Sequence, residues 1–556
     1  MKKEKDKTIE DFFEELIMAI WVVIQFSLWP IKASSKIGGI FENLIRSFIF
    51  YGLLLGVFFL YSFAHKKDFS YLNFLWFSIP SVLIFCFRYL LFSLNSKRPK
   101  EIKKITVDNL KEKKKFNFYR FPSLMENPLS APVGLSLISK EPVFLNVKER
   151  CQHTIVSGAT GQGKTTLLKT LLSHSLKHNH PVIIIDPKGE KEDILEMKRK
   201  ARFYGRENDF CLFSLSFPEE SFAYNPLLNG TAEQIKARLM DGLRFEEEYY
   251  KSQASLFLGG ILSAFRFLNE PVSFSLLDKY LNEKSLVKNL IDDLSDKSKA
   301  ATSKEEKKKA DELIVILEQI QDIPKKDLAG LQAQISSINC LEFRKVLSPS
   351  NFHSKCFFSL EDILRERRVA YFQMNVNGYG EISRQIGRMI LQDLKVLSNQ
   401  IQAGQKQFSY NFCPCFIDEF GSFVTNDFSD FLKMARSAKI GIHLFCQGLS
   451  DLSKLSSDFK NQIIGNTINK ILFRQDVGSD AEEWAEVAGT FSSRKKTYQI
   501  FGTETSEEMT GMGTVRDTKE MKIEFDVFKS LSQGQAILID KAFHTEDLFQ
   551  VWRPVL

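Results

Sequence analysis

Residues 158–165 read GATGQGKT and match the pattern GxxxxGK[ST]. An apolar run at residues 153–156 precedes this stretch, and a helix-forming stretch follows it from about Lys164. A glycine-rich loop between a strand and a helix can turn its backbone N–H groups inward around a phosphate chain, with the helix N-terminus behind them. Because of this context we prefer a functional loop to a chance match, and the sequence predicts an α/β fold that binds a nucleoside triphosphate.

The residues of this loop have separate expected tasks. Lys164 would span the β- and γ-phosphates, and the Thr165 hydroxyl would ligate Mg²⁺. Contact with the nucleotide is expected for Gly158, Ala159, Thr160, Gly161, Gln162, Gly163, Lys164, Thr165 and Thr166. The predicted cofactors are therefore ATP and Mg²⁺.

A second motif supplies the carboxylates that such a loop requires. Residues 412–420 read FCPCFIDEF, an apolar run closed by Asp418 and Glu419. Asp418 would hold Mg²⁺, usually through its water shell, and Glu419 would orient the attacking water for in-line transfer. An ordinary strand that ends in an acidic turn is the alternative, and the loop upstream makes it the weaker one. The pair of motifs predicts an ATP-hydrolysing enzyme.

The formal net charge of +7 is unevenly distributed along the 556 residues. Residues 1–120 contain 20 Lys and Arg against 11 Asp and Glu, whereas the remainder is close to neutral. The basic excess therefore belongs to the N-terminal segment. Eight cysteines show no paired spacing beyond Cys413 and Cys415, which lie inside the apolar run, so we expect reduced thiols and a cytosolic catalytic part.

The N-terminal segment contains two apolar runs without charged side chains, at residues 47–64 and 69–87. At about 1.5 Å per residue, each would just span a hydrocarbon core of ~30 Å as a helix. Seven basic residues precede the first run and eleven lie at residues 88–120. The charge rule then places both termini in the cytoplasm. The segment is predicted to be a transmembrane hairpin, with buried core helices as the alternative.

Two further stretches complete a predicted membrane region over residues 1–120. Residues 16–31 are apolar but short, and we interpret them as an interfacial helix, with a third membrane span as the alternative. No cleavable signal peptide is recognised at the N-terminus. Residues 97–115 are rich in lysine and are interpreted as a solvated basic neck beside anionic lipid headgroups.

Downstream of residue 120, strand-like apolar runs alternate with helical patterns. These runs are PVFLNV, HTIVSGA, PVIIIDPKGE, VAYFQMNV, FCPCFIDEF, GIHLFCQG, INKILFRQ and GQAILID. They predict a mostly parallel sheet covered by helices over residues 121–228 and 346–556. Residues 229–345 have helical periodicity and no convincing strand, which predicts an all-α insertion. Residues 296–312 mix acidic and basic side chains, and we interpret them as a solvated helix face or linker.

The order of these features resembles the type IV secretion coupling proteins of the TraD/TraG type, within the FtsK/HerA-like superfamily. The resemblance covers nearly the whole chain. It is carried by the membrane hairpin, GATGQGKT, IIIDPKGE (183–190), FAYNPL (222–227), the helical insertion, FIDEF, ARSAKIGIHLFCQGLSDL (435–452) and GMGTVRDTKEMKIEFDVFKSLSQGQAILI (511–539).

This resemblance implies a RecA-like P-loop ATPase that forms a homo-hexamer at the bacterial inner membrane. Such a motor delivers single-stranded DNA with a relaxase, or effector proteins, to a type IV secretion channel. The resemblance assigns Gln447 as the sensor of the γ-phosphate and Arg436 as the arginine that reaches the neighbouring subunit's nucleotide. A polar strand end and a surface salt bridge are the respective alternatives, and Arg474 is a second candidate arginine.

Two questions stay open at this point. Asp186 and Lys188 follow a predicted strand near the loop, and we expect a structural or coupling role for them rather than a catalytic one. The cargo is also undecided: an ATPase for protein effectors alone is the main alternative to DNA transfer, and a chromosome translocase of the FtsK type is a more remote one.

Overall fold

The computed structural model describes residues 104–110, 121–283, 285–348, 356–425, 427–503 and 506–553. The predicted interfacial helix (16–31) and the two predicted transmembrane runs (47–64 and 69–87) lie outside these residues. Within the described ranges, no helix has both the length and the apolar character needed to cross a membrane. Residues from Lys103 onward form one compact unit.

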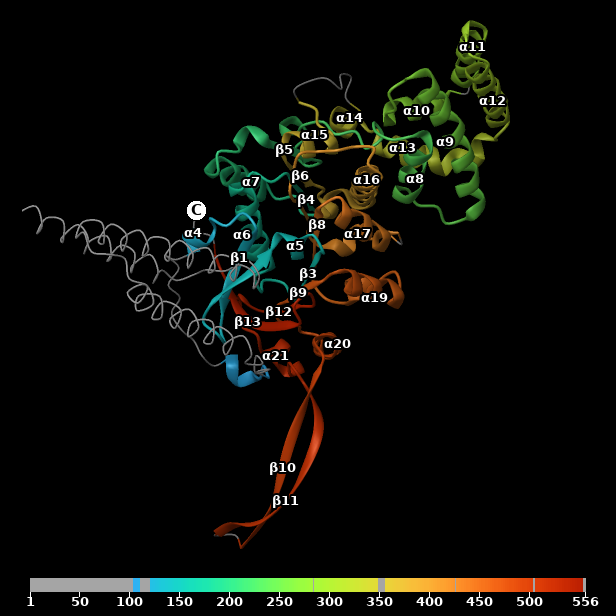
Figure 1. Ribbon diagram of the computed structural model, residues 1–556. Helices are drawn as coiled ribbons and strands as arrows, with labels where there is room; N and C mark the ends of the chain where they lie inside the picture. The colour runs from blue at the N-terminus through green and yellow to red at the C-terminus, as the bar shows by residue number, and fades with distance from the viewer. Residues whose placement is uncertain are drawn as a thin grey trace, which may run out of the picture. The chain divides into compact units, whose positions relative to one another are not determined.

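A mixed sheet of 11 strands forms the centre of this unit, in the order β2-β1-β13-β12-β9-β3-β8-β7-β4-β6-β5 (Figure 1). The run from β9 to β5 is parallel throughout. Its members are β9 (Asn469–Leu472), β3 (Thr154–Ser157), β8 (Ile440–Cys446), β7 (Cys413–Ile417), β4 (Val182–Asp186), β6 (Val369–Gln373) and β5 (Phe210–Ser214). The prediction of an α/β fold with a mostly parallel sheet is confirmed.

An antiparallel extension continues the sheet beyond β9. It consists of β12 (Gln535–Asp540), β13 (Thr545–Val551), β1 (Ser130–Ser136) and β2 (Pro142–Asn146). The sequence patterns had indicated β2 and β12 but not β1, β5 or β13. The extension matters for function because Gly534, just before β12, contacts the P-loop: its N–H donates to the carbonyl of Gln162.

Helices cover both faces of the parallel strands, which explains why these strands are uniformly apolar. In β4, Ile183 and Ile185 belong to one hydrophobic cluster, whereas Val182 and Ile184 belong to another on the opposite face. The second cluster includes α6 (Lys164–Lys177) and α7 (Lys191–Phe203), and the first includes α16 (Val376–Gln402) and α17 (Phe428–Ser437). Both faces of each strand are therefore buried, as expected for parallel sheets.

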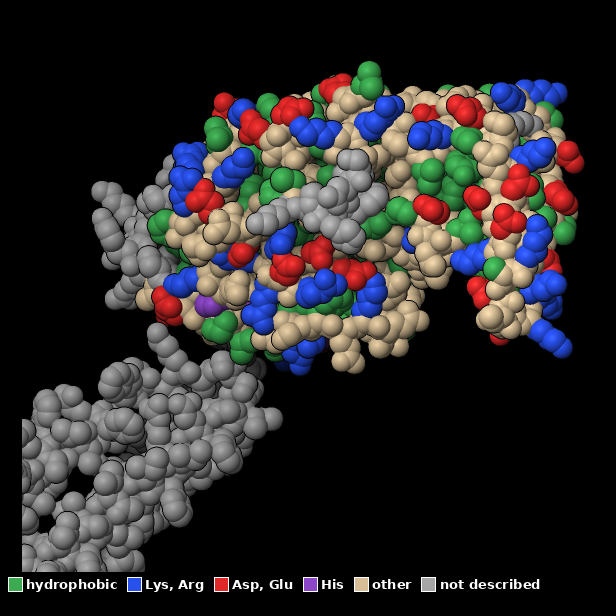
Figure 2. All heavy atoms as spheres, turned by 90° about the horizontal axis from the view of Figure 1, so that it is seen from above, with side chains coloured by type: hydrophobic (Ala, Val, Ile, Leu, Met, Phe, Trp, Pro, Cys, Tyr) green, Lys and Arg blue, Asp and Glu red, His purple; other side chains and the backbone are tan. Residues whose placement is uncertain are grey.

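Between β5 and β6 the described chain contains helices and no strand of the sheet. These are α8 (Ala232–Gly242), α9 (Glu248–Leu268), α10 (Phe274–Asn282), α11 (Ser285–Ala300), α12 (Lys304–Gln321), α13 (Ala329–Ile338), α14 (Leu341–Leu347) and α15 (Leu360–Glu366), with short 3-10 turns. Exposed charges of both signs alternate on α11 and α12, as in the pairs Lys299 with Asp296 and Lys309 with Glu305. Figure 2 shows basic and acidic side chains mixed on the face that it presents.

A buried ion pair joins this helical segment to α16. The Nη2 of Arg238, on α8, lies 2.8 Å from Oδ1 of Asp393, and both side chains are almost completely buried. The Tyr224 hydroxyl donates to the other carboxylate oxygen at 2.6 Å. The helical segment is thereby fixed to a helix of the motor by charge as well as by packing.

Two other features depart from the sequence-based picture. Lys104 and Ile105, in the predicted solvated neck, are packed: Ile105 is 1% exposed and bridges to Ile523, and Lys104 pairs with Glu520 at 2.9 Å. This part of the neck therefore belongs to the motor unit. A hairpin that the patterns did not indicate, β10 (Thr490–Thr503) with β11 (Ser506–Met521), extends from the body as a two-stranded ribbon (Figure 1).

Candidate active site

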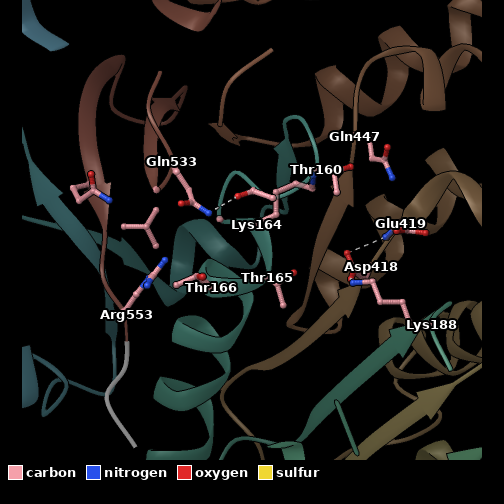
Figure 3. A pocket seen from close by; sticks show the side chains of 15 residues that line it. Thr160, Lys164, Thr165, Thr166, Lys188, Asp418, Glu419, Gln447, Gln533 and Arg553 are labelled. Atoms are coloured by element: carbon pink, nitrogen blue, oxygen red, sulfur yellow. Dashed lines mark hydrogen bonds and ion pairs between the residues drawn. The ribbon is translucent and has the colours of Figure 1, made fainter. Parts of the chain in front are cut away.

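A pocket opens where the parallel strands end, beside the P-loop (Figure 3). The loop follows β3, Gln447 follows β8, Asp418 and Glu419 follow β7, and Lys188 follows β4. Because these strands are neighbours and parallel, their carboxyl ends bring the four segments together. The full lining is Thr160, Gly161, Gly163, Lys164, Thr165, Thr166, Lys188, Asp418, Glu419, Gln447, Gln533, Gly534, Gln550, Val551 and Arg553.

The glycines of the P-loop are required by its shape. Gly163 has a φ of 120°, in the region that favours glycine, and it caps the start of α6. A Cβ added to Gly158 would lie 2.5 Å from Cβ of Phe473 in the segment after β9. Backbone contacts fix the loop further: the N–H of Ala159 donates to the carbonyl of Arg474 at 2.9 Å. The main chains of Gly158 and Ala159 shape the cradle, although these residues do not line the pocket themselves.

Lys164 and Thr165 face the pocket from the first turn of α6. The Lys164 ammonium donates to the carbonyl oxygens of Gly158 and, at 3.0 Å, of Ala159. Burial lowers the pKa of Lys164, and the nearby charges of Asp418 and Glu419 act against that effect. Carbonyl oxygens compensate only part of a buried positive charge, so an anionic phosphate chain is a favourable partner for this ammonium.

The two carboxylates after β7 differ in their surroundings. Asp418 is buried, and its Oδ1 accepts from the backbone N–H of Glu419 at 3.1 Å. Glu419 is half-buried in the pocket wall and has a φ of 41°. A left-handed backbone at a residue other than glycine costs about 1–3 kcal/mol, and such strain is concentrated at functional sites. The buried carboxylate suits a metal ligand, and the more accessible one suits contact with water.

Lys188 occupies a more central place than the sequence indicated. Its Nζ lies 2.8 Å from Oδ2 of Asp418. Burial opposes the charged form of Lys188, but the carboxylates of Asp418 and Asp186 raise its pKa above the ordinary value. Asp186 is itself buried and accepts from the Tyr371 hydroxyl at 2.8 Å, and burial together with the charge of Asp418 raises its pKa to about 6.

The two predicted arginines and the predicted sensor lie in different places. Gln447 lines the pocket. Arg436 is exposed near the end of α17, just before the first residue of β8. It therefore lies near the amino ends of the parallel strands, whereas Lys164 lies near their carboxyl ends. Arg474 touches the P-loop through its carbonyl, while its Nε lies 2.9 Å from Oδ1 of Asp476. The structure therefore brings Gln447, but neither arginine side chain, into the pocket of the same chain.

The other wall of the pocket comes from the antiparallel extension, and sequence reasoning missed it. Gln533 donates from Nε2 to the carbonyl of Gly161 at 2.9 Å, and the N–H of Gly534 donates to the carbonyl of Gln162 at 2.8 Å. Gln550 and Arg553 also line the pocket. Figure 3 shows Arg553 and Gln533 on one side of the P-loop and Lys188 and the carboxylates on the other.

The donor set fits magnesium and a triphosphate. Magnesium prefers oxygen ligands and is usually held by one or two protein groups together with phosphates and water. Thr165 and Asp418 supply such oxygens from facing sides of one pocket. In the described part of the chain no cluster of three or more His, Cys, Asp or Glu side chains could hold a metal without a ligand's help. Because Thr165 and Asp418 line the same pocket as the P-loop, a magnesium ion bound to the nucleotide fits this donor set.

Two family models match the chain. Residues 132–348 match the central domain of the helicase HerA, and residues 413–526 match the TraM recognition site of TraD and TraG. The first range contains the P-loop, and the second contains Asp418, Glu419 and Gln447. Both halves of the candidate site thus lie within matched segments.

Similar proteins include solved structures and one curated sequence. The plasmid coupling protein TrwB, in complex with the non-hydrolysable GTP analogue GDPNP, is 12% identical over 79% of this chain and 93% of its own, with a TM-score of 0.50. VirB4 of Thermoanaerobacter pseudethanolicus is 13% identical over 77% of this chain and 98% of its own, with a TM-score of 0.44. An uncharacterized protein of Mycoplasma pneumoniae is 31% identical over 74 residues, which are 13% of this chain and 62% of that protein. The P-loop site and the two matched segments show that the chain is a P-loop ATPase, similar to HerA over residues 132–348 and to the coupling proteins TraD and TraG over residues 413–526.

Proposed function

We propose that this ATPase is the coupling motor of a type IV secretion or conjugation system. It would use ATP hydrolysis to deliver and translocate single-stranded DNA, with its relaxase, to the secretion channel. One observation carries the proposal: a complete P-loop and carboxylate pocket lies in a chain whose residues 413–526 match the TraM recognition site of TraD and TraG.

The main polar residues of the pocket have separate tasks in this proposal. Lys164 and the N–H groups of the P-loop bind and orient the phosphates, and Thr165 and Asp418 hold Mg²⁺. When bound, magnesium would neutralise the negative charge that develops on the phosphate oxygens. Glu419 holds the attacking water in line, and Gln447 hydrogen-bonds where the γ-phosphate would lie. Gln550 and Arg553, on the other wall, would contact the part of the nucleotide beyond the phosphates.

We propose further that the active form is a homo-hexamer, as the resemblance to the TraD/TraG coupling proteins implies. In this chain Arg436 lies beside the amino end of β8, whereas Lys164 follows the carboxyl end of the neighbouring strand β3. Strand β8 has seven residues, so its amino and carboxyl ends are separated by about 20 Å at ~3.3 Å per residue. Arg436 is exposed and so is available to a neighbouring copy, whereas it is far from the phosphates bound by its own chain. An arginine supplied in trans stabilises charge during phosphoryl transfer.

The proposed location is the bacterial inner membrane, with both termini and the motor in the cytoplasm. This part rests on residues 47–64 and 69–87 and on the basic residues around them. The proposed partners are channel components, membrane lipids and a relaxase-bound DNA.

The test measures ATP hydrolysis by the purified full-length protein with and without single-stranded DNA. We expect activity that requires Mg²⁺, that DNA stimulates, and that Lys164→Ala and Glu419→Gln abolish. Glu419→Gln should retain nucleotide binding, since it removes the group that orients water and leaves the phosphate cradle intact. Hydrolysis that is indifferent to DNA but stimulated by a secreted protein would replace DNA with an effector as the cargo. No hydrolysis under any of these conditions would contradict the proposal.

A further inference from the structure

Asp418 has two oxygen atoms, and both have partners in the structure. Oδ1 accepts from the N–H of Glu419 at 3.1 Å, and Oδ2 lies 2.8 Å from the Lys188 ammonium. The Asp418 side chain is 10% exposed and that of Lys188 is 32% exposed, so water screens this pair less than a surface pair. The oxygen that faces Lys188 belongs to the same carboxylate that the proposed function assigns to Mg²⁺.

The other cations that line the pocket lie elsewhere than beside Oδ2 of Asp418. The Lys164 ammonium donates to carbonyls of the P-loop. Arg553 lies on the opposite wall (Figure 3). Lys188 is therefore the positively charged side chain in contact with Asp418 among the described residues that line the pocket. It neutralises a buried carboxylate that has a second carboxylate, Asp186, nearby.

The main chain of Lys188 is fixed on both sides, whereas the ion pair with Asp418 is the contact that holds the end of its side chain. Its N–H donates to Oδ1 of Asp186 at 2.9 Å, and its carbonyl accepts from the N–H of Asn375 at 3.3 Å. Gly189 follows, and a Cβ there would lie 2.5 Å from Cγ of Asn375, so the turn is closely packed. A lysine on a fixed turn has a flexible four-carbon stem with a point charge at its end.

We propose that Lys188 is a positioning residue that competes with magnesium for Asp418. It keeps the carboxylate neutralised and in place between nucleotides, and it withdraws from Oδ2 when magnesium nucleotide binds. Two cations beside one buried oxygen repel each other, so the presence of Lys188 weakens magnesium binding while it stabilises the metal-free protein. The inference depends on the proposed role of Asp418, and it assigns Lys188 a function beyond the structural one.

The experiment compares thermal unfolding of the full-length protein in two conditions. The first is EDTA without nucleotide, and the second is a fixed saturating concentration of ADP with increasing Mg²⁺. Lys188→Met should lower the melting temperature in EDTA, because Asp418 and Asp186 lose the charge between them. It should also reduce the Mg²⁺ concentration for half-maximal stabilisation by about three- to tenfold, because the competing charge is gone.

Three matched variants make the result specific. Lys188→Arg keeps the charge and should stay within about twofold of the wild type in its magnesium dependence. Lys191→Met removes an exposed lysine that pairs with Glu220 at 2.5 Å on the surface, and it should change neither measurement. Lys188→Gln keeps a hydrogen-bond donor without the charge, and it replaces the methionine variant if that variant does not fold.

The outcomes separate this inference from the proposed function. If magnesium and ADP fail to stabilise the wild type, the assignment of the site itself is wrong. If they stabilise the wild type and Lys188→Met needs as much magnesium or more, the competition is refuted and Lys188 has a purely structural or phosphate-binding role. A lower requirement in Lys188→Met and Lys188→Gln, with no change in Lys191→Met, supports it.

Discussion

The three glycines of the P-loop provide a graded test of the site, because the structure gives each a different environment. At Gly158 an added Cβ would lie 2.5 Å from Cβ of Phe473 and 3.1 Å from its Cα. At Gly163 it would lie 3.1 Å from Cε1 of Phe473, on a backbone with a φ of 120°. At Gly161 no atom lies within 4 Å, although φ is 76°. Alanine therefore meets a steric clash and an unfavourable φ at position 158, a close contact and an unfavourable φ at position 163, and an unfavourable φ alone at position 161.

The magnitudes follow from these contacts. Overpacking against a well-packed neighbour costs about 1–3 kcal/mol, and a left-handed backbone costs about 1 kcal/mol or more at a residue with a Cβ. If the loop must relieve these costs by leaving its cradle shape, each 1.4 kcal/mol lowers nucleotide affinity about tenfold. We expect Gly158→Ala and Gly163→Ala to weaken binding by about ten- to a hundredfold, and Gly161→Ala by about fivefold.

The assay is a titration of each full-length variant with a fluorescent ATP analogue in the presence of Mg²⁺. Thermal unfolding without nucleotide shows whether each variant is folded. The reasoning fails if Gly161→Ala binds more weakly than the other two variants, or if all three bind as tightly as the wild type. Either result would mean that the phosphate cradle does not have the backbone shape described.

Three further predictions concern other parts of the molecule. Asp393→Ala should lower the free energy of unfolding by about 3–5 kcal/mol, because it leaves the charge of Arg238 buried without its carboxylate partner. Urea unfolding followed by circular dichroism measures this free energy. A double variant with Arg238→Met and Asp393→Leu should lose much less of it. Arg553→Ala should weaken ATP binding by about two- to fivefold with little effect on the rate at saturation, as steady-state kinetics would show. Chains with Arg436→Ala and chains with Lys164→Ala are each expected to be nearly inactive and to regain part of their hydrolysis when mixed; no recovery at any ratio would contradict an arginine supplied in trans.

Local chemistry explains which parts of the site the sequence could predict. Residues 158–165 act through the shape of one loop, so their pattern is visible without the fold. Asp418 and Glu419 close an apolar strand, and that position is also a local signal. The parallel strands were recognisable because burial on both faces makes them continuously apolar.

The remaining features depend on contacts between distant segments. Lys188 meets Asp418 because β4 and β7 are neighbours in the sheet, and no spacing in the sequence records that pairing. Gln533 and Arg553 reach the pocket through the antiparallel extension and belong to no phosphate-binding motif. The β10–β11 hairpin consists largely of polar and charged residues, so apolar alternation did not reveal it. Ile105 is a single apolar residue within a lysine-rich stretch, and only the fold shows it to be buried.

The position of β3 inside the sheet has a consequence for synthesis on the ribosome. Its two neighbours, β8 and β9, are translated long after it, and the wall formed by Gln533 and Arg553 emerges later still. A nascent chain that has completed the P-loop therefore has strand edges without partners, which are sites for association with other chains. Nucleotide can help to hold the motor together only after most of the polypeptide has emerged, because the residues of its pocket are spread from the P-loop to Arg553.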